Sequence, residues 1–214
     1  MVTTQESLDP SGVAHPVEVS PPAAPAADPS MLGLPVFIVG SLALGLALTG
    51  FLPATAAGGV LPIIFSSTVL GLLLTTIWAI SVGQTAVASI FGLFTGFWLS
   101  YVALLLGLTH GWYAIAAADV KDTVGTFLLC WTIIVAVLTV AMLRLPAAFT
   151  LLLALVTLAL AFVTLGTFNT SPNLSKLGGY VVLAFALVGV YLFLSASAVT
   201  LGGKGYPLGR ALQR

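Results

Sequence analysis

Few side chains in this sequence are suited to chemistry. The chain of 214 residues has six Lys or Arg, six Asp or Glu and two His, and its one cysteine is Cys130. His15 and His110 lie far apart in the sequence, so neither metal-ligand spacing nor a Ser/His/Asp grouping is present. A single cysteine excludes a disulfide framework and a cysteine-based metal site. The sequence therefore predicts no catalytic residues, no metal and no cofactor, and it indicates that the protein is not an enzyme.

Aromatic and small residues form the other notable patterns. Four aromatic residues have the spacing of one helical face: Phe94, Phe97, Trp98 and Tyr101. Such a stripe serves packing or lipid contact more often than it forms a gate, and both interpretations stay open. Gly92 and Gly96 form a GxxxG pair, which allows another helix to approach closely within the bundle or between subunits.

Asp28 and Pro29 stand at the start of the first long apolar stretch. An Asp followed by Pro is typical of a helix N-terminus, where Asp caps the free N–H groups and Pro takes the first helical position. Free N–H groups at a helix N-terminus also bind anions, but an ionised Asp28 would repel one. The sequence leaves a simple helix cap and an anion entrance as alternatives.

The composition excludes a water-soluble globule. Hydrophobic residues make up 59% of the chain and charged residues 6%, and the mean hydropathy is +1.18. A soluble domain has about 25% charged residues and about 45–50% apolar ones. The formal net charge is zero, so no set of basic residues is available to neutralise a row of phosphates. We therefore expect an integral membrane protein surrounded by a lipid bilayer, without a nucleic-acid partner.

Six apolar stretches are long enough to cross a bilayer, which takes roughly 20 residues. They cover residues 32–52, 59–79, 86–108, 124–143, 146–168 and 178–201. None contains an ionisable Asp, Glu, Lys, Arg or His. Backbone groups in lipid must be satisfied internally, and the continuous apolar runs lack the alternation of barrel strands. The predicted fold class is an all-α membrane protein with six transmembrane helices around a narrow central pathway.

The chain divides into three expected parts. Residues 1–27 are rich in Pro and Ala, cannot bury a core and lack the pattern of a signal peptide, so we expect a disordered tail. Residues 28–203 form the membrane domain, and residues 204–214 form a short basic tail. Six spans place both termini on one side, and that side carries four basic residues against two on the other. This bias favours cytoplasmic termini in the plasma (inner) membrane.

The spans lack the ionisable groups that usually mark proton and ion pathways in a membrane, which argues against a carboxylate proton relay. What remains is a narrow pore lined by small and hydroxyl side chains. The residues alone leave three alternatives open. These are a carboxylate transporter, a channel for a small neutral solute such as urea or ammonia, and a non-transporting membrane scaffold or sensor.

Several motifs resemble a known family, in register over residues 28–210. Pro29, Leu32-Gly33-Leu34 and Phe37 resemble the family signature Asn-Pro-x-x-Leu-Gly-Leu. The segment 94–99, Phe-Thr-Gly-Phe-Trp-Leu, resembles a Tyr-Gly-Ser-Phe-Trp-Leu segment of the third span. Near the C-terminus, residues 206–209 resemble a closing Leu-Pro-Ile-Gly. The sequence thus resembles the acetate uptake transporter family, also called the succinate–acetate permease (SatP) family.

The resemblance implies six-helix protomers that assemble as a homo-hexamer, each with its own pathway for acetate, succinate and related carboxylates, and for protons. It implies a pathway constriction at three positions: Phe37, Phe94 and Val156. It implies a substrate entrance at five positions: Asp28, Pro29, Leu32, Gly33 and Leu34.

Departures from the family pattern make the expected pathway less polar. Phe94 stands where the family has a Tyr, and Leu72 stands where it has a Gln. We therefore expect a small monocarboxylate rather than a dicarboxylate. An ionised carboxylate pays a large desolvation cost in an apolar ring, whereas a neutral acid pays only a few kcal/mol, so we also expect a proton to accompany the substrate.

Overall fold

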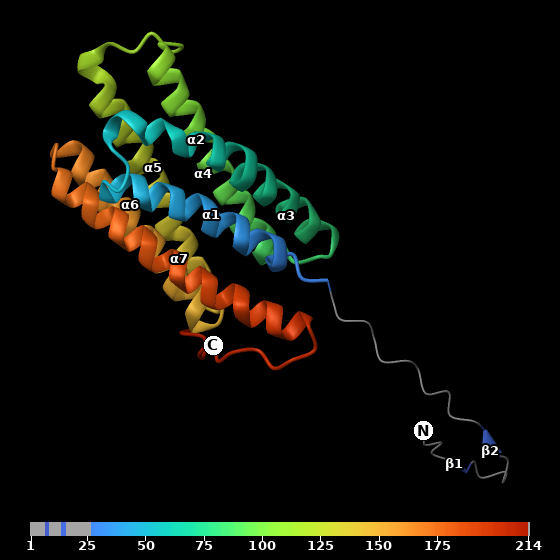
Figure 1. Ribbon diagram of the computed structural model, residues 1–214. Coiled ribbons are helices and arrows are strands. Elements are labelled where there is room, and N and C mark those ends of the chain that lie inside the picture. Colours follow the sequence, from blue (N-terminus) through green and yellow to red (C-terminus); the bar gives the residue numbers. More distant parts are fainter. Residues whose placement is uncertain (1–6, 9–13, 16–26, 214) are drawn as a thin grey trace.

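The computed structural model describes residues 7–8, 14–15 and 27–213, in which the long helices form a single bundle (Figure 1). Six helical segments are long and apolar enough to cross a membrane: Ser30–Thr49, Ala54–Ser81, Thr85–His110, Ala117–Ala141, Ala147–Phe168 and Pro172–Thr200. The predicted all-α membrane fold with six spans is confirmed.

Two of the six spans are composite. The first, third, fifth and sixth spans are α1 (Ser30–Thr49), α4 (Thr85–His110), α6 (Ala147–Phe168) and α7 (Pro172–Thr200). The second span consists of a 3-10 helix η1 (Ala54–Gly59), α2 (Val60–Ile63), a π-helical segment η2 (Ile64–Val69) and α3 (Leu70–Ser81). In the fourth span, a 3-10 turn η3 (Ala117–Asp119) precedes α5 (Val120–Ala141).

Most of the predicted disordered tail lies outside the described residues. Within this tail, residues 7–8 and 14–15 form two short strands, β1 (Ser7–Leu8) and β2 (Ala14–His15). They pair antiparallel, with Ser7 opposite His15.

Some helix ends differ from the apolar stretches in the sequence. α1 ends at Thr49 because Gly50 has a left-handed φ of 83° and its N–H bonds back to Ala47. α7 begins at Pro172, six residues before the expected span at 178, and the Ser171 side chain accepts a hydrogen bond from the N–H of Leu174. Pro is favoured in the first turn of a helix, so the cap and the proline start this helix before the sequence becomes apolar.

Small residues allow the spans to pack closely. α7 packs against both α1 and α6, α6 packs against α5, and α3 packs against α4 (Figure 1). A Cβ on Gly71 of α3 would lie 2.6 Å from Val36 of α1, so only glycine permits this approach. Nearby, the Thr68 hydroxyl of η2 donates a hydrogen bond to the Val36 carbonyl oxygen at 3.0 Å. This bond ties the π-helical segment to α1.

Two threonine pairs join α5 to α6. The hydroxyls of Thr132 and Thr164 lie 3.0 Å apart, and those of Thr139 and Thr157 lie 2.9 Å apart. Each hydroxyl also lies within hydrogen-bond distance of a carbonyl of its own helix. Because a hydroxyl has one hydrogen, one member of each pair donates to the other, and the accepting hydroxyl donates to its own carbonyl. The two pairs fix the position of α6 along α5.

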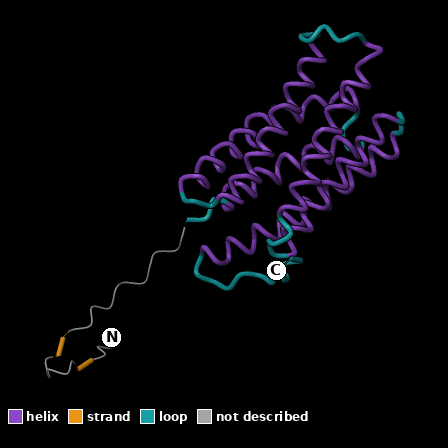
Figure 2. The backbone as a smooth tube through the Cα atoms, turned by 180° about the vertical axis from the view of Figure 1, so that it is seen from behind, coloured by secondary structure: helices purple, strands orange, loops and turns teal. Residues whose placement is uncertain are grey.

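The C-terminal segment folds back under the bundle instead of extending away from it. Tyr191 Oη donates to the Pro207 carbonyl oxygen at 2.8 Å, and the Leu208 carbonyl accepts from the free N–H of Ala148 at the start of α6 at 2.9 Å. The N-terminal end of α1 and this segment lie at the same end of the bundle (Figure 2).

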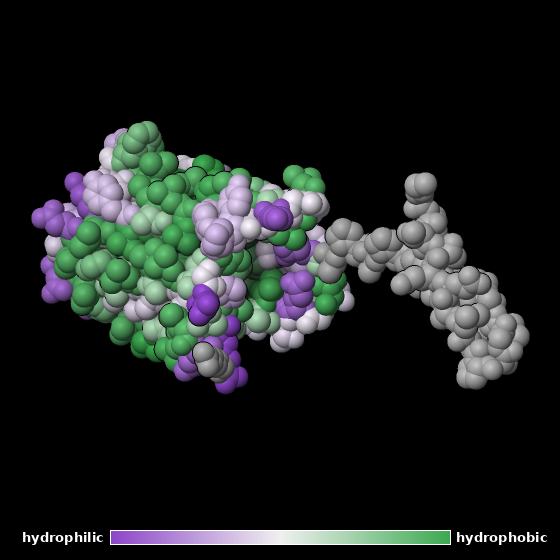
Figure 3. Space-filling view, turned by 90° about the horizontal axis from the view of Figure 1, so that it is seen from below, coloured by the Kyte–Doolittle hydropathy of each residue, from purple (hydrophilic) through white to green (hydrophobic). Residues whose placement is uncertain are grey.

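Large apolar side chains cover much of the bundle surface. Seen from below, hydrophobic groups dominate the bundle, with hydrophilic groups in scattered patches and near one end (Figure 3). Four large apolar residues on α3 and α5 are more than half exposed: Leu74, Ile77, Ile133 and Val137. Exposed apolar surface of this kind suits contact with lipid.

Candidate functional site

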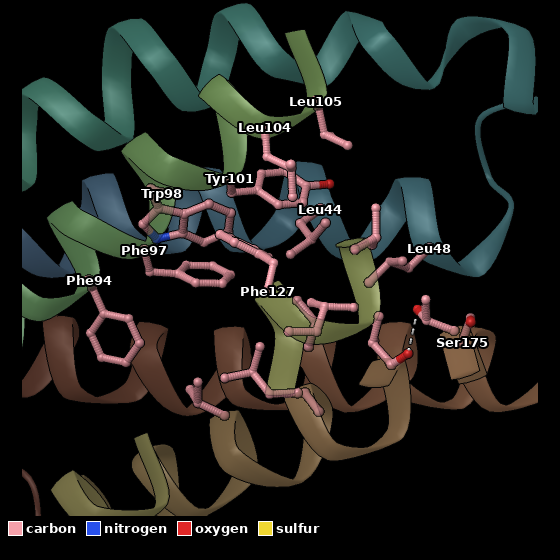
Figure 4. Close-up of a pocket in the computed structure, with 18 of the residues that line it drawn as sticks. Leu44, Leu48, Phe94, Phe97, Trp98, Tyr101, Leu104, Leu105, Phe127 and Ser175 are labelled. Carbon is pink, nitrogen blue, oxygen red and sulfur yellow. Dashed lines mark hydrogen bonds between the residues drawn. The ribbon is translucent and has the colours of Figure 1, made fainter. Parts of the chain in front are cut away.

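A partly open apolar cavity of about 240 Å³ lies in the bundle toward the end opposite the termini. Helices α1, α4, α5, α6 and α7 line this cavity. Its wall from α4 carries the aromatic stripe predicted from the sequence, with Phe97, Trp98 and Tyr101 in sequence along the helix (Figure 4). The stripe therefore both packs against other helices and lines the cavity.

A second, smaller cavity of about 100 Å³ lies toward the termini. Its lining comes from the first turns of α1, α4 and α6 and from the later part of α7. Along α1, the lining runs from Ser30 to Phe37. Leu192 is the lining residue from α7.

Phe37 and Phe94 line both cavities and separate them. Their ring centroids lie 5.0 Å apart with the planes tilted by 58°, and both side chains are buried. Phe185 of α7 adds a third ring, 5.7 Å from Phe37. The structure thus brings together the two aromatic residues that the family resemblance implied at a constriction.

Phe185 was not among the residues predicted from the sequence. It lies within the continuous apolar run of the last span, where no motif distinguishes it from its neighbours. Only the packing of α7 against α1 reveals its position beside Phe37.

Val156 lies in the wall of the larger cavity and does not line the smaller one. It is 5% exposed. One turn earlier on α6, Leu152 and Leu153 line the smaller cavity. α6 therefore passes from one cavity to the other between Leu153 and Val156, beside the aromatic pair.

The five residues expected at the entrance have different surroundings. Asp28 Oδ1 accepts the N–H of Ser30 at 2.9 Å, which is a capping interaction. Pro29 directly precedes Ser30, the first residue of α1, and already has helical φ and ψ of −59° and −21°. Leu34 lines the smaller cavity, whereas a Cβ on Gly33 would lie 2.5 Å from Phe91, so Gly33 serves close packing. Leu32 is partly buried and lines neither cavity.

The GxxxG pair contacts two different helices of the same chain. A Cβ on Gly92 would lie 3.2 Å from Thr76 of α3, and one on Gly96 would lie 3.4 Å from Trp131 of α5. Both glycines therefore allow close packing within the protomer.

No charged side chain lines either cavity among the described residues. Thr167 and Ser175, at the far end of the larger cavity, direct their hydroxyls to backbone carbonyls, at 2.9 Å and 3.4 Å. Within residues 7–8, 14–15 and 27–213, no group of three His, Cys, Asp or Glu side chains is placed to hold a metal ion. These walls favour small uncharged solutes over free ions, because an unpaired charge in an apolar site is strongly disfavoured.

The fold is similar to that of a solved transport protein. The structure matches a chain described as the structure of the bacterial acetate channel SatP, with a TM-score of 0.76 and 20% sequence identity, over 86% of this chain and 99% of that chain. At this level of identity the match shows a shared fold. A search of curated proteins found no significant match.

The family assignment comes from the sequence. A model of the GPR1/FUN34/yaaH family matches residues 11–201. This range includes all six spans and both cavities, and it agrees with the acetate uptake transporter family that the motifs predicted. The chain belongs to the GPR1/FUN34/yaaH family.

Proposed function

We propose that this protein carries acetate and related short monocarboxylates across a membrane. Family membership and the shared fold with a bacterial acetate channel support a role in transport. The observation that carries the proposal is the pair of uncharged cavities that meet at Phe37 and Phe94. A small organic acid fits such a route, because it combines a short apolar group with a carboxyl group that is neutral when protonated.

We propose that Phe37, Phe94 and Val156 form the constriction of this route. The two rings are in contact, and Val156 lines the larger cavity beside them. Apolar constrictions can exclude water and so gate a pathway. The contact between the rings supports a closed state that opens only when a solute separates them.

Proton co-movement follows from the same apolar walls. With a carboxyl pKa of ~4.3, about 0.2% of a short acid is protonated at pH 7. The ionised form would lose its hydration at the rings without meeting a compensating charge, whereas the neutral form loses much less. The acid would therefore pass together with its proton, which amounts to symport of the two.

A homo-hexameric assembly in the plasma (inner) membrane, with cytoplasmic termini, belongs to the same proposal. The family resemblance supports the assembly, and the excess of basic residues on the termini side supports the orientation. The exposed apolar faces of α3 and α5 leave room for contacts with lipid or with other protomers.

The second candidate is a channel for a neutral solute such as urea or ammonia. The absence of charged side chains from the lining of the described cavities favours this channel as much as it favours an acid transporter. Flux into proteoliposomes separates the two. We expect labelled acetate to enter well above the leak of protein-free liposomes, and labelled urea to enter only at the leak rate.

The pH dependence of this flux tests proton co-movement. Well above the acid's pKa of ~4.3, the neutral fraction falls about tenfold for each pH unit. The protein-dependent acetate flux at fixed total acetate should fall in the same way, and an uncoupler should abolish uptake driven by a pH gradient. Equal flux of acetate and urea would favour the neutral channel, and flux independent of pH would contradict proton co-movement.

A further inference from the structure

Trp98 has a buried hydrogen-bond donor without an acceptor. The side chain is 2% exposed, and its Nε1–H has no hydrogen-bond partner among the described residues. Buried tryptophan N–H groups usually find a partner, because leaving a donor unsatisfied away from water is costly. An orphan donor of this kind therefore requires an explanation.

The location of the donor suggests what it binds. Trp98 lies on α4 one helical turn after Phe94, and both residues line the larger cavity. Phe97 holds the indole in an edge-to-face contact with centroids 5.0 Å apart. In Figure 4 the indole nitrogen lies on the side of the ring system toward Phe94. The donor thus lies on the Phe94 side of a residue that lines the larger cavity.

The other polar groups of this cavity are either occupied or directed elsewhere. The hydroxyls of Thr167 and Ser175 already donate to backbone carbonyls. The Tyr101 hydroxyl points away from the Trp98 nitrogen (Figure 4). Among the described lining residues, Trp98 therefore provides an unoccupied donor on the side of Phe94.

We propose that the Trp98 indole N–H binds a carboxyl oxygen of the substrate as it passes the Phe37–Phe94 pair, and that it favours solutes that carry such an acceptor oxygen. The inference rests on the proposed function. The indole donates but does not accept, so it can hold the carbonyl oxygen of the neutral acid without adding a charge to the pathway. Trp98 would then be the specificity-determining residue on this side of the constriction.

The burial of the nitrogen links binding to opening. Nε1 exposes less than 1 Å² in this structure, in which the rings of Phe37 and Phe94 are in contact. In this proposal, a solute that separates the rings reaches the donor and occupies it. The hydrogen bond would thus stabilise the open arrangement only for solutes that carry an acceptor oxygen.

The test compares Trp98→Phe with Trp131→Phe. Trp131 contacts the same Phe97, with centroids 5.4 Å apart, but lines neither cavity, so it is a matched control. Loss of one hydrogen bond should raise the half-saturating acetate concentration for flux about two- to tenfold in Trp98→Phe. Trp131→Phe should remain at the wild-type value.

A spectroscopic measurement makes the test independent of transport rates. In protein labelled with ¹⁵N at the indole nitrogens, the ¹H–¹⁵N signal that is absent from Trp98→Phe belongs to Trp98. Added acetate should shift this signal in the wild-type protein. Adding Phe94→Tyr to Trp98→Phe should restore part of the acetate affinity, because it places a hydroxyl one turn away on the same cavity wall.

The outcomes distinguish this inference from the proposed function. Wild-type protein without acetate flux would overturn the proposed function. Wild-type acetate flux together with an unchanged half-saturating concentration in Trp98→Phe and an unmoved indole signal would overturn the role of Trp98 alone. A shifted signal with weakened acetate affinity would support it.

Discussion

The rings of Phe37 and Phe94 meet at a centroid distance of 5.0 Å between two cavities with almost entirely apolar walls. Each ring comes from a different helix, α1 and α4, so their contact depends on tertiary packing. In our account, the size of these two side chains sets which solutes pass.

Phe94→Ala should widen the constriction and relax selectivity. We expect the flux of a larger acid such as butyrate, relative to acetate, to rise roughly tenfold, which corresponds to about 1.4 kcal/mol less barrier. Phe91→Ala is the matched control, because Phe91 lies on the same helix but lines only the smaller cavity. Flux ratios in proteoliposomes provide the measurement.

A buried Phe→Ala change costs about 3–5 kcal/mol of stability, so the folded fraction of each variant should be checked by size-exclusion chromatography. Phe94→Leu, which removes less volume, should show the same change in flux ratio to a smaller extent. Unchanged rate and substrate range in folded Phe94→Ala would mean that Phe94 does not gate the pathway.

The two aromatic residues at the cavity junction could be named from sequence because they lie in short motifs that resemble a family. Phe185 and the orphan donor of Trp98 could not be identified in this way. A phenylalanine in a continuous apolar run has no periodic signal that separates a lining position from a packed one. Whether an N–H is unsatisfied depends on atoms from distant parts of the chain.

At the scale of helices, the contact between α1 and η2 depends on one glycine. A Cβ on Gly40 would overlap the Thr68 side chain, whose hydroxyl bonds to the Val36 carbonyl. Gly40→Ala should therefore cost about 1–3 kcal/mol through overpacking and lower the thermal midpoint of the purified protein in detergent.

Gly58→Ala is the control for this change, since nothing lies within 4 Å of its added Cβ and the position is helical. Its thermal midpoint should stay near or slightly above the wild-type value. Removing the overlapping atoms with Thr68→Ala should recover part of the loss in Gly40→Ala. Equal midpoints for the Gly40 and Gly58 variants would show that this helix contact is not tightly packed.

Apolar length was sufficient to predict six helices but not their ends. The start of α7 at Pro172 depends on a cap and a proline that precede the apolar run. The π-helical turns of η2 also have no signature in the apolar pattern, because they depend on how the second span fits against α1. Local sequence therefore predicts the elements, and packing determines their limits.

At the scale of the whole molecule, the two cavities lie in line between the termini end and the opposite end of the bundle. The order of the helices around them could not be obtained from the sequence, because it depends on contacts between distant segments such as α1 and α7. The central claim is that both cavities belong to one route for the acid.

Chemical blocking of each cavity tests this claim most directly. Single cysteines replace Leu34 in the smaller cavity or Val156 in the larger one, in a Cys130→Ala background. Val137→Cys on the exposed face of α5 is the control. After reaction with N-ethylmaleimide, verified by mass spectrometry, acetate flux should be abolished in both cavity variants and unchanged in the control. Undiminished flux through either fully modified cavity variant would contradict a single route past Phe37 and Phe94.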